Sequence, residues 1–539
     1  MEPPALSLPP EILSEIFLIY NDIPFYLHDL KADDPPPWLI ITSVCRYWRE
    51  VALNTALLWN VIDVERSFEL IELFLARSAG APLDIYGNNT QDSDVENYLD
   101  TLNYWDTLPL ILTEIGRIRK LDIDLTLEMR EAFESTPWDT ANILSVLHLH
   151  HFGDEYELLL FLDNLKTPLL REMKISMSPF ADGPLPWKNY SLSKSLTHLN
   201  ISGGSFVQTN PMVVANVIRD LQLLEVLMLD DTFDVPSSLD SPNLNPSRFP
   251  VALPHLQQLH LTNTTFTACA PFLEYVKIPS STLVVMVFDN NDLQPARGAD
   301  EVMINLLRRR LNPIATTASV GVDILVIGCE FLTFDVSELS RPPPPLDRNP
   351  HLCLSYLHDE PDEERLSCFM HLVRNILVGV PLCNITMLSI HFLPQYATAE
   401  ADWRALAACL PNVIAISVYQ DSKYASTGWS WSVEMTVALF KVTPGDDGQP
   451  RSVNFPKLKL LCLRNFNVKD TGGTDALDSS FDFVEGLRDA FMRRREAGFE
   501  DGFAVRIDIK NCEGVDSGGV RRLEDAAVVV WDGNGSRGL

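Results

Sequence analysis

The sequence predicts an α/β fold in which a short helical unit precedes a curved sheet of many short parallel strands. Two observations predict it. Apolar residues recur at helical spacing within the first sixty positions, and a short strand pattern then returns at a nearly constant interval from Ile118 onward. The length of 539 residues and the apolar fraction of 46% are those of an ordinary globular protein with room for several domains.

The first helix of the helical unit is expected to begin at Pro9 and Pro10, because proline suits the first turn of a helix. Its apolar face is formed by two i,i+4 pairs, Ile12 with Ile16 and Leu13 with Phe17. A second helix is predicted from apolar residues at spacings of three, four and seven, namely Ile41, Val44, Cys45, Trp48 and Ala52. A domain this small cannot bury all of that surface, and surplus apolar surface usually marks a partner.

Two separated motifs in this unit carry a family resemblance. Residues 8–17 read LPPEILSEIF, residues 44–49 read VCRYWR, and Leu58-Trp59 closes the second motif. Order and spacing together resemble the F-box, with a longer connection than usual from Asn21 to Trp38. We assign residues 1–65 to this F-box-like helical domain. The alternative is an ordinary helical cap for the domain that follows.

The strand pattern is apolar-x-x-apolar-x-apolar, and its central residue recurs about every 26 to 32 positions between Leu121 and Met286. The first occurrences are Ile118-x-x-Leu121-x-Ile123, Leu144-x-x-Leu147-x-Leu149, Leu170-x-x-Met173-x-Ile175, Leu196-x-x-Leu199-x-Ile201, Leu224-x-x-Leu227-x-Leu229, Leu256-x-x-Leu259-x-Leu261 and Leu283-x-x-Met286-x-Phe288. This period is typical of leucine-rich repeats, whose units bury their apolar faces by stacking.

The repeat predicts a leucine-rich-repeat-like solenoid over residues 66–515, followed by a C-terminal cap and tail at 516–539. Leu83-x-Ile85 is an early repeat, and several returns are expected to be helical, for example Tyr156–Leu165 and Met212–Leu221. Beyond residue 290 the pattern continues at wider spacing, with insertions such as Arg341–Pro345. A doubly wound α/β domain is the alternative, although its buried strands would need a longer period.

Composition argues against several classes of protein. Lys and Arg total 42 against 73 Asp and Glu, and a net charge of −31 disfavours nucleic acid and anionic membranes as direct partners. No apolar run is long enough for a transmembrane helix, and no secretory signal opens the sequence. The nine cysteines form no Cys-x-x-Cys pair, so we expect reduced thiols and an intracellular location, cytoplasmic or nuclear.

Polar residues between the core positions of the strands are expected to line the concave face. The candidate substrate-binding residues are His148, His150, His198, Asn200, Gln258, His260, His391 and Tyr419. Such a row can read a peptide through hydrogen bonds, and the alternative is that polar residues simply fill exposed strand positions. His148, His150 and His151 near Asp154 lack further ligands at fixed spacing, so we expect neither a metal site nor a cofactor.

The resemblance implies the substrate-recognition subunit of a Skp–cullin–F-box ubiquitin ligase. The helical domain would bind a Skp-type adaptor, the solenoid would hold a target protein, and the chain would catalyse nothing itself. By the family pattern, the adaptor-binding residues are Leu8, Pro9, Ile12, Leu13, Ile16, Phe17, Val44, Cys45 and Trp48. A repeat scaffold without a ligase role is the runner-up, and a hydrolase-like α/β enzyme is a third possibility. The lax repeats also resemble the expanded F-box families of mushroom-forming fungi.

Overall fold

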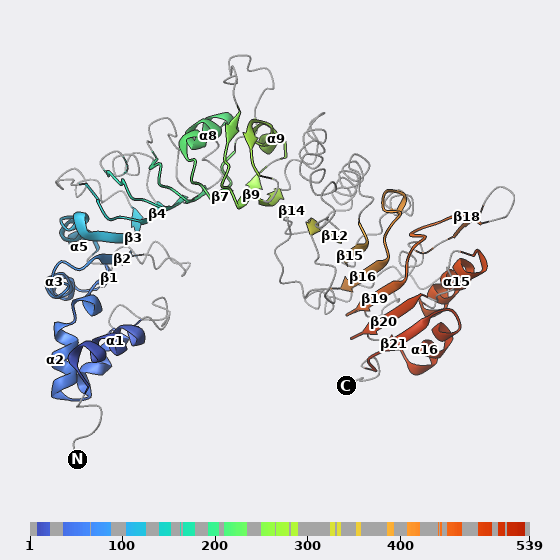
Figure 1. The fold of residues 1–539 in the computed structure, drawn as a ribbon, viewed down its shortest axis with the longest axis horizontal. Coiled ribbons are helices and arrows are strands. Elements are labelled where there is room, and N and C mark those ends of the chain that lie inside the picture. The colour runs from blue at the N-terminus through green and yellow to red at the C-terminus, as the bar shows by residue number, and fades with distance from the viewer. Residues whose placement is uncertain are drawn as a thin grey trace. The chain divides into compact units, whose positions relative to one another are not determined.

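The computed structural model describes residues 8–21, 36–64, 66–87, 104–125, 140–151, 162, 165–177, 192–203, 210–233, 250–264, 266–279, 282–288, 324–328, 331–335, 352–356, 385–392, 407–420, 440, 442–444, 450–465, 483–498, 505–512 and 515–533. The chain forms two compact units (Figure 1). Unit 1 is Met1–Gln258 with Tyr275–Ile278, and unit 2 is Leu259–Glu274 with Pro279–Leu539. Among the described residues, no helix combines the length and apolarity needed to cross a membrane.

Unit 1 opens with four short helical elements: α1 (Pro10–Asn21), η3 (Pro37–Ser43), α2 (Arg46–Asn54) and η4 (Ala56–Trp59). The expected start of α1 is confirmed, but the expected single second helix is wrong. Ile41 lies in the 3-10 helix η3, and α2 starts only after Cys45, whose backbone is extended (φ −160°, ψ 171°). The Cys45 sulfur accepts a hydrogen bond from the Trp48 amide at 3.4 Å, so it caps α2 rather than lying within it.

Aromatic side chains join these helices to the next element, α3 (Phe68–Arg77). The ring of Trp59 lies 4.8 Å from that of Trp38 and 5.0 Å from that of Phe74, centre to centre. The guanidinium of Arg77 stacks over Trp59 at 4.9 Å, a cation–π contact that strengthens the joint. The helical elements and α3 therefore share one core instead of being connected by a loose linker.

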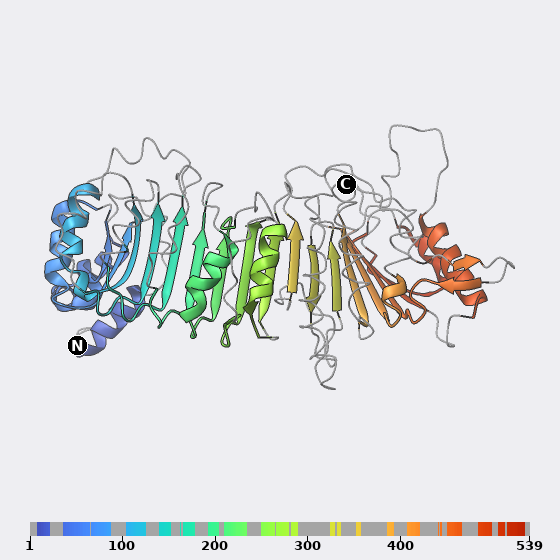
Figure 2. The ribbon, with the colours of Figure 1, turned by 90° about the horizontal axis from the view of Figure 1, so that it is seen from above.

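Seven parallel strands follow in sequence order: β1 (Val61–Asp63), β2 (Leu83–Gly87), β3 (Ile118–Leu125), β4 (Val146–His151), β5 (Glu172–Met177), β6 (His198–Ser202) and β7 (Val226–Asp230). Each pairs in parallel with its successor (Figure 2). The predicted repeat centres lie in register from Leu121 through Leu147 and Met173 to Leu227. All of them are buried. The expected strands and their parallel pairing are confirmed in this unit.

The same pair of hydrogen bonds between neighbouring repeats precedes successive strands. The carbonyl of Ser145 accepts hydrogen bonds from two consecutive amides, Arg171 (2.9 Å) and Glu172 (3.0 Å). The carbonyl of Arg171 does the same for Thr197 (2.8 Å) and His198 (2.9 Å). A carbonyl that accepts two hydrogen bonds in each repeat fixes the starting position of each strand relative to the previous one. The repeat centres therefore stay in register.

Helices α3, α5 (Tyr104–Leu112) and α8 (Pro211–Val217) lie on one side of this sheet (Figure 1). Short 3-10 turns follow α5 at Ile115–Arg117 and α8 at Ile218–Asp220. The expected helical return at 212–221 is therefore confirmed, whereas the one at 156–165 lies almost wholly outside the described residues. The small strands β8 (Val251–Ala252) and β10 (Val276–Lys277) complete the unit as a parallel pair.

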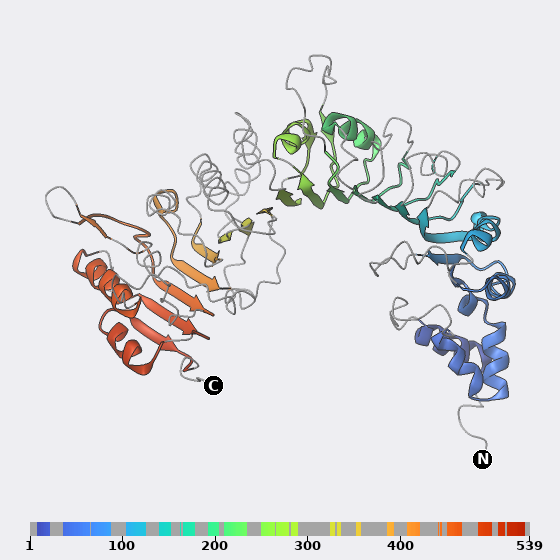
Figure 3. The ribbon, with the colours of Figure 1, turned by 180° about the vertical axis from the view of Figure 1, so that it is seen from behind.

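Unit 2 contains the remaining elements. They are β9 (Gln258–Thr264, whose first residue belongs to unit 1), α9 (Phe266–Tyr275, whose last residue does), β11 (Leu283–Phe288), β12 (Ile324–Gly328), β13 (Phe331–Asp335), β14 (Leu352–Tyr356), β15 (Met387–Phe392), β16 (Ala415–Gln420), β17 (Val442–Pro444), β18 (Pro450–Val453), β19 (Leu460–Arg464), α15 (Phe483–Glu496), β20 (Arg506–Lys510), α16 (Ser517–Glu524) and β21 (Val528–Trp531). Strands β15, β16, β19, β20 and β21 pair in parallel. Helices α15 and α16 pack side by side next to them (Figure 3).

The expectation of a wholly parallel sheet is wrong in unit 2. Strand β13 runs antiparallel to both β12 and β14, while β14 is parallel to β11 and β12 is parallel to β15. Only two residues separate β12 from β13, and a parallel crossover needs about a dozen. Strands β13 and β14 also lie in a region where only widened spacing and insertions were expected. β21, within the predicted cap, adds a further parallel strand.

Candidate functional site

The first candidate surface lies on the opening helices. Helix α1 buries Leu13 and Phe17, yet Ile12, Ile16 and Ile19 on its other side are exposed, Ile19 at 65%. These three follow one another at intervals of four and three residues, so they form one stripe along the helix. Helix α1 is thus apolar on both sides, and of the two only the side of Leu13 and Phe17 is buried among the described residues.

The neighbouring elements add to this exposed apolar surface. Ile40 in η3 is 64% exposed, Val44 is 58% exposed, and Leu57 in η4 is 44% exposed. Half of the large hydrophobic side chains that are exposed in the described part of the chain lie between Ile12 and Leu57. Concentrated exposure of this kind is typical of a protein–protein contact. We call the six residues Ile12, Ile16, Ile19, Ile40, Val44 and Leu57 the helical apolar surface.

The nine sequence-predicted adaptor residues separate into three groups by exposure. Pro9, Ile12, Ile16 and Val44 are exposed, and Leu8, Cys45 and Trp48 are partly exposed. Leu13 and Phe17 are buried at 0% and 1% exposure, so they hold α1 in place from inside. Trp48 packs its ring against Phe17 at 5.3 Å between ring centres, which makes it mainly a packing residue.

Sequence reasoning missed Ile19, Ile40 and Leu57. Ile19 could have been found, because it continues the spacing of Ile12 and Ile16. Ile40 gave no such signal, since its exposure follows from the 3-10 geometry of η3, which buries its neighbours Trp38 and Ile41. The sequence therefore predicted Ile12, Ile16 and Val44 of this surface, whereas Ile40 and Leu57 were found only once the helices were placed.

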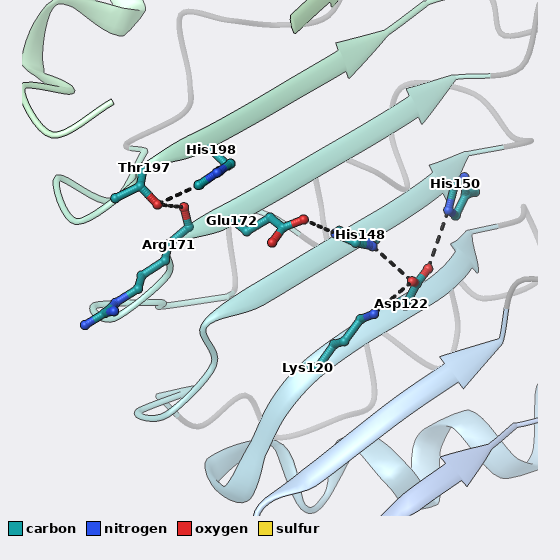
Figure 4. A network of polar contacts seen from close by, with 8 residues as sticks. All are labelled: Lys120, Asp122, His148, His150, Arg171, Glu172, Thr197 and His198. Carbon is teal, nitrogen blue, oxygen red and sulfur yellow. Dashed lines mark hydrogen bonds and ion pairs between the residues drawn. The ribbon is translucent and has the colours of Figure 1, made fainter. Parts of the chain in front are cut away.

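The second candidate surface is the strand face, defined as the side of β3–β7 that turns away from the helices. Here Asp122 on β3, His148 on β4 and Glu172 on β5 form a chain of contacts (Figure 4). His148 Nδ1 lies 3.0 Å from Asp122 Oδ2, and His148 Nε2 lies 3.0 Å from Glu172 Oε1. His150 Nε2 stands 3.5 Å from the other Asp122 oxygen.

The environment of Asp122 sets its charge. Burial by itself would raise its pKa, but hydrogen bonds from His148 and His150 and the nearby Lys120 together lower the pKa of Asp122 well below its usual range. The Lys120 amine stands 3.7 Å from Asp122 and also 4.5 Å from the ring centre of Tyr86. Burial raises the pKa of Tyr86. Asp122 is therefore an anion surrounded by donors from its own and the next strand.

The other predicted substrate-binding residues are placed less uniformly. His150 is only 9% exposed, whereas His198 is exposed and its Nδ1 lies 2.9 Å from the Thr197 hydroxyl. Asn200 and Gln258 are partly exposed. His260, on β9, is partly buried, and burial lowers its pKa. His391 and Tyr419 are backbone partners in the parallel β15–β16 pair, and their side chains lie outside the described structure.

The structure brings Asp122, His148 and His150 together as strand neighbours, as the alternation predicts. Glu172 was missed, although it lies two residues before Lys174 and so belongs to the same face. Within the described residues, no group of three or more histidine, cysteine or acidic side chains is arranged to hold a metal ion. Hydrogen bonding and charge are what the described residues of this face offer.

Comparison with known proteins adds one assignment. No curated protein matches the chain in a sequence search. Residues 5–65, the segment that contains the whole helical apolar surface, match the family model described as F-box-like. The chain therefore carries an F-box-like domain at these residues.

Proposed function

We propose that the chain is the substrate-recognition subunit of a Skp–cullin–F-box ubiquitin ligase. The observation that carries the proposal is the helical apolar surface, six exposed apolar side chains within the segment that matches the F-box-like family. F-box domains generally bind Skp-type adaptors. Burying one side chain of this size stabilises a complex by roughly 1.5–3 kcal/mol, so a few of them suffice for a specific contact.

In this proposal the chain contributes proximity and no chemistry. The aromatic contacts of Trp59 with Trp38 and Phe74 connect the F-box-like helices to α3. A target held further along unit 1 would therefore be presented in a fixed geometry relative to the adaptor. Raising the local concentration of target lysines near the ligase is the whole of the proposed effect.

The remainder of the chain, residues 66–515 with a cap and tail at 516–539, is proposed to be a leucine-rich-repeat-like solenoid that holds the target. Support comes from the sequential parallel pairing of β1–β7, the register of their core residues and the repeated pair of hydrogen bonds before β5, β6 and β7. The strand face would then be a target-binding surface, with His148, His150, His198 and Asn200 as contacts, and the predicted residues Gln258, His260, His391 and Tyr419 on later strands are proposed as further contacts. A scaffold without a ligase role is the competing function.

Binding to a purified Skp-type adaptor tests the first half of the proposal. The full chain with Ile16→Asp and Val44→Asp should lose at least about a hundredfold in adaptor affinity, because two exposed apolar contacts become charged. Leu73→Asp is the matched control: Leu73 is 39% exposed on α3, outside the F-box-like match, and should leave affinity unchanged.

The same measurement separates the competing functions. An unaltered chain that fails to bind the adaptor, while its unfolding transition is intact, would support the scaffold. Equal loss of affinity in the Leu73→Asp chain would show that the contact is non-specific. Trp48 is avoided here because its ring packs on Phe17, and a change there would confuse folding with binding.

A further inference from the structure

His148 occupies an unusual position between two carboxylates on different strands. Its two ring nitrogens each lie 3.0 Å from a carboxylate oxygen, of Asp122 on β3 and of Glu172 on β5 (Figure 4). An ionised carboxylate can only accept a hydrogen bond, and a neutral imidazole has a single N–H to donate. Both contacts can be hydrogen bonds only when the imidazole of His148 carries two protons.

The charges around His148 agree with this state. Lys120 and Asp122 from β3 and Glu172 from β5 surround the ring, so a protonated His148 makes the group of four electrically neutral. Asp124 on β3 and Lys174 on β5 are further charged groups on this face, and His150 on β4 itself reaches Asp122. A neutral His148 would leave one uncompensated negative charge.

When His148 loses a proton, the two carboxylates are not equally affected, because only one of them loses its hydrogen bond from the ring. Asp122 keeps His150 and Lys120 beside it at 3.5 and 3.7 Å, and its side chain is only 14% exposed. Glu172 is 45% exposed, and within the described residues His148 is the donor that the structure gives to its side chain. A neutral His148 therefore keeps its single N–H on the more enclosed Asp122, and Glu172 is released.

We propose that His148 is a proton-operated clamp across β3, β4 and β5. In the charged form it joins Asp122 to Glu172, and in the neutral form it holds Asp122 alone and frees the Glu172 carboxylate on the strand face. Gain or loss of a single proton by the imidazole therefore switches the hydrogen-bonding pattern and the charge of this face. The proposal rests on the contacts of His148 and is independent of the ligase function.

The ring N–H groups can be observed directly by NMR of the full chain with labelled histidine, because a hydrogen-bonded ring N–H exchanges slowly with water. At pH 5.5 His148 should give two low-field N–H signals, both absent from His148→Gln. At pH 8 the Nε2–H signal should be lost and the Nδ1–H signal retained. Two signals that persist at pH 8, an Nε2–H signal alone, or no signal at either pH would each overturn the clamp.

Two further variants make the test independent of how His148→Gln folds. Glu172→Gln, at an exposed position, should remove the Nε2–H signal at pH 5.5 and leave Nδ1–H in place. Survival of both signals in that variant would show that Glu172 is not the partner. His198→Gln is the matched control, since His198 is an exposed histidine on the same face and its loss should leave both His148 signals unchanged.

Discussion

The F-box-like helices and the strand face of unit 1 differ in which side chains they expose. The helices bury Leu13 and Phe17 but leave Ile12, Ile16 and Ile19 in solvent. On the strand face, polar groups of neighbouring strands contact one another, for example Asp122 and His148. Exposed apolar side chains are stabilised when another surface buries them, so a concentration of them favours a protein partner. A polar face that closes its own hydrogen bonds can bind a partner only by exchanging them, which makes its binding selective and sensitive to conditions.

The largest expected effect is on the free energy of unfolding, and it concerns Trp59, which connects the F-box-like helices to α3. Trp59→Ala should lower the free energy of unfolding by about 3–5 kcal/mol, because it removes a buried ring packed on both Trp38 and Phe74. Chemical denaturation followed by intrinsic fluorescence measures it. Leu57→Ala, in the same short helix but 44% exposed, should cost far less, and equal losses would contradict the packing argument.

The second effect concerns the helical apolar surface itself. Ile40→Asp should weaken adaptor binding by about ten- to a hundredfold, since one buried aliphatic contact of roughly 1.5–3 kcal/mol is lost. Calorimetric titration with the purified adaptor gives the affinity. Leu223, 49% exposed but outside the F-box-like match, provides the control through Leu223→Asp. An unchanged affinity of the Ile40 variant would restrict the contact to α1 and Val44.

The third effect tests whether the strand face is held by its own charges. Because the pKa of Asp122 is lowered on folding, its stabilising contribution is complete above the ordinary aspartate pKa near 3.9 and is lost as pH falls through the folded value. Asp122→Asn should therefore cost about 1–3 kcal/mol at pH 7 and progressively less in acid.

Denaturation curves of both chains between pH 7 and pH 3 provide the comparison. Glu50→Gln, at an exposed position on α2, should leave the curves unchanged at pH 7. A difference between wild type and Asp122→Asn that stays constant down to pH 3 would mean that the charge of Asp122 contributes nothing.

The smallest effect concerns His260 on β9. Burial lowers its pKa, so the folded protein resists protonating it, and stability is lost as pH falls below the ordinary histidine value near 6.5. His260→Gln should flatten the decline in the thermal midpoint between pH 7 and pH 5.5 by about a degree or two. His255→Gln, at an exposed position, should leave the decline in the thermal midpoint unchanged. An unchanged decline in the His260 variant would show that its burial is immaterial.

The sequence predicted the strands of unit 1 well because their core residues obey a simple rule. Leu121, Leu147 and Met173 recur at a nearly constant interval, and residues that face the same core must be apolar. Prediction failed where geometry depends on local chain length. Strands β13 and β14 and the break at Cys45 have no periodic signal, since a two-residue link and a helix cap are set by backbone conformation.

The F-box-like segment, the positions of most strands and the presence of histidines on one face can all be predicted from the sequence, because spacing alone decides which side of a helix or strand a residue occupies. Which of those residues contact each other follows only from the three-dimensional fold. Ile16 stays in solvent while Phe17 beside it is buried, and His148 meets Glu172 from the next strand. Such partnerships depend on distances between segments far apart in the chain, which no local pattern encodes.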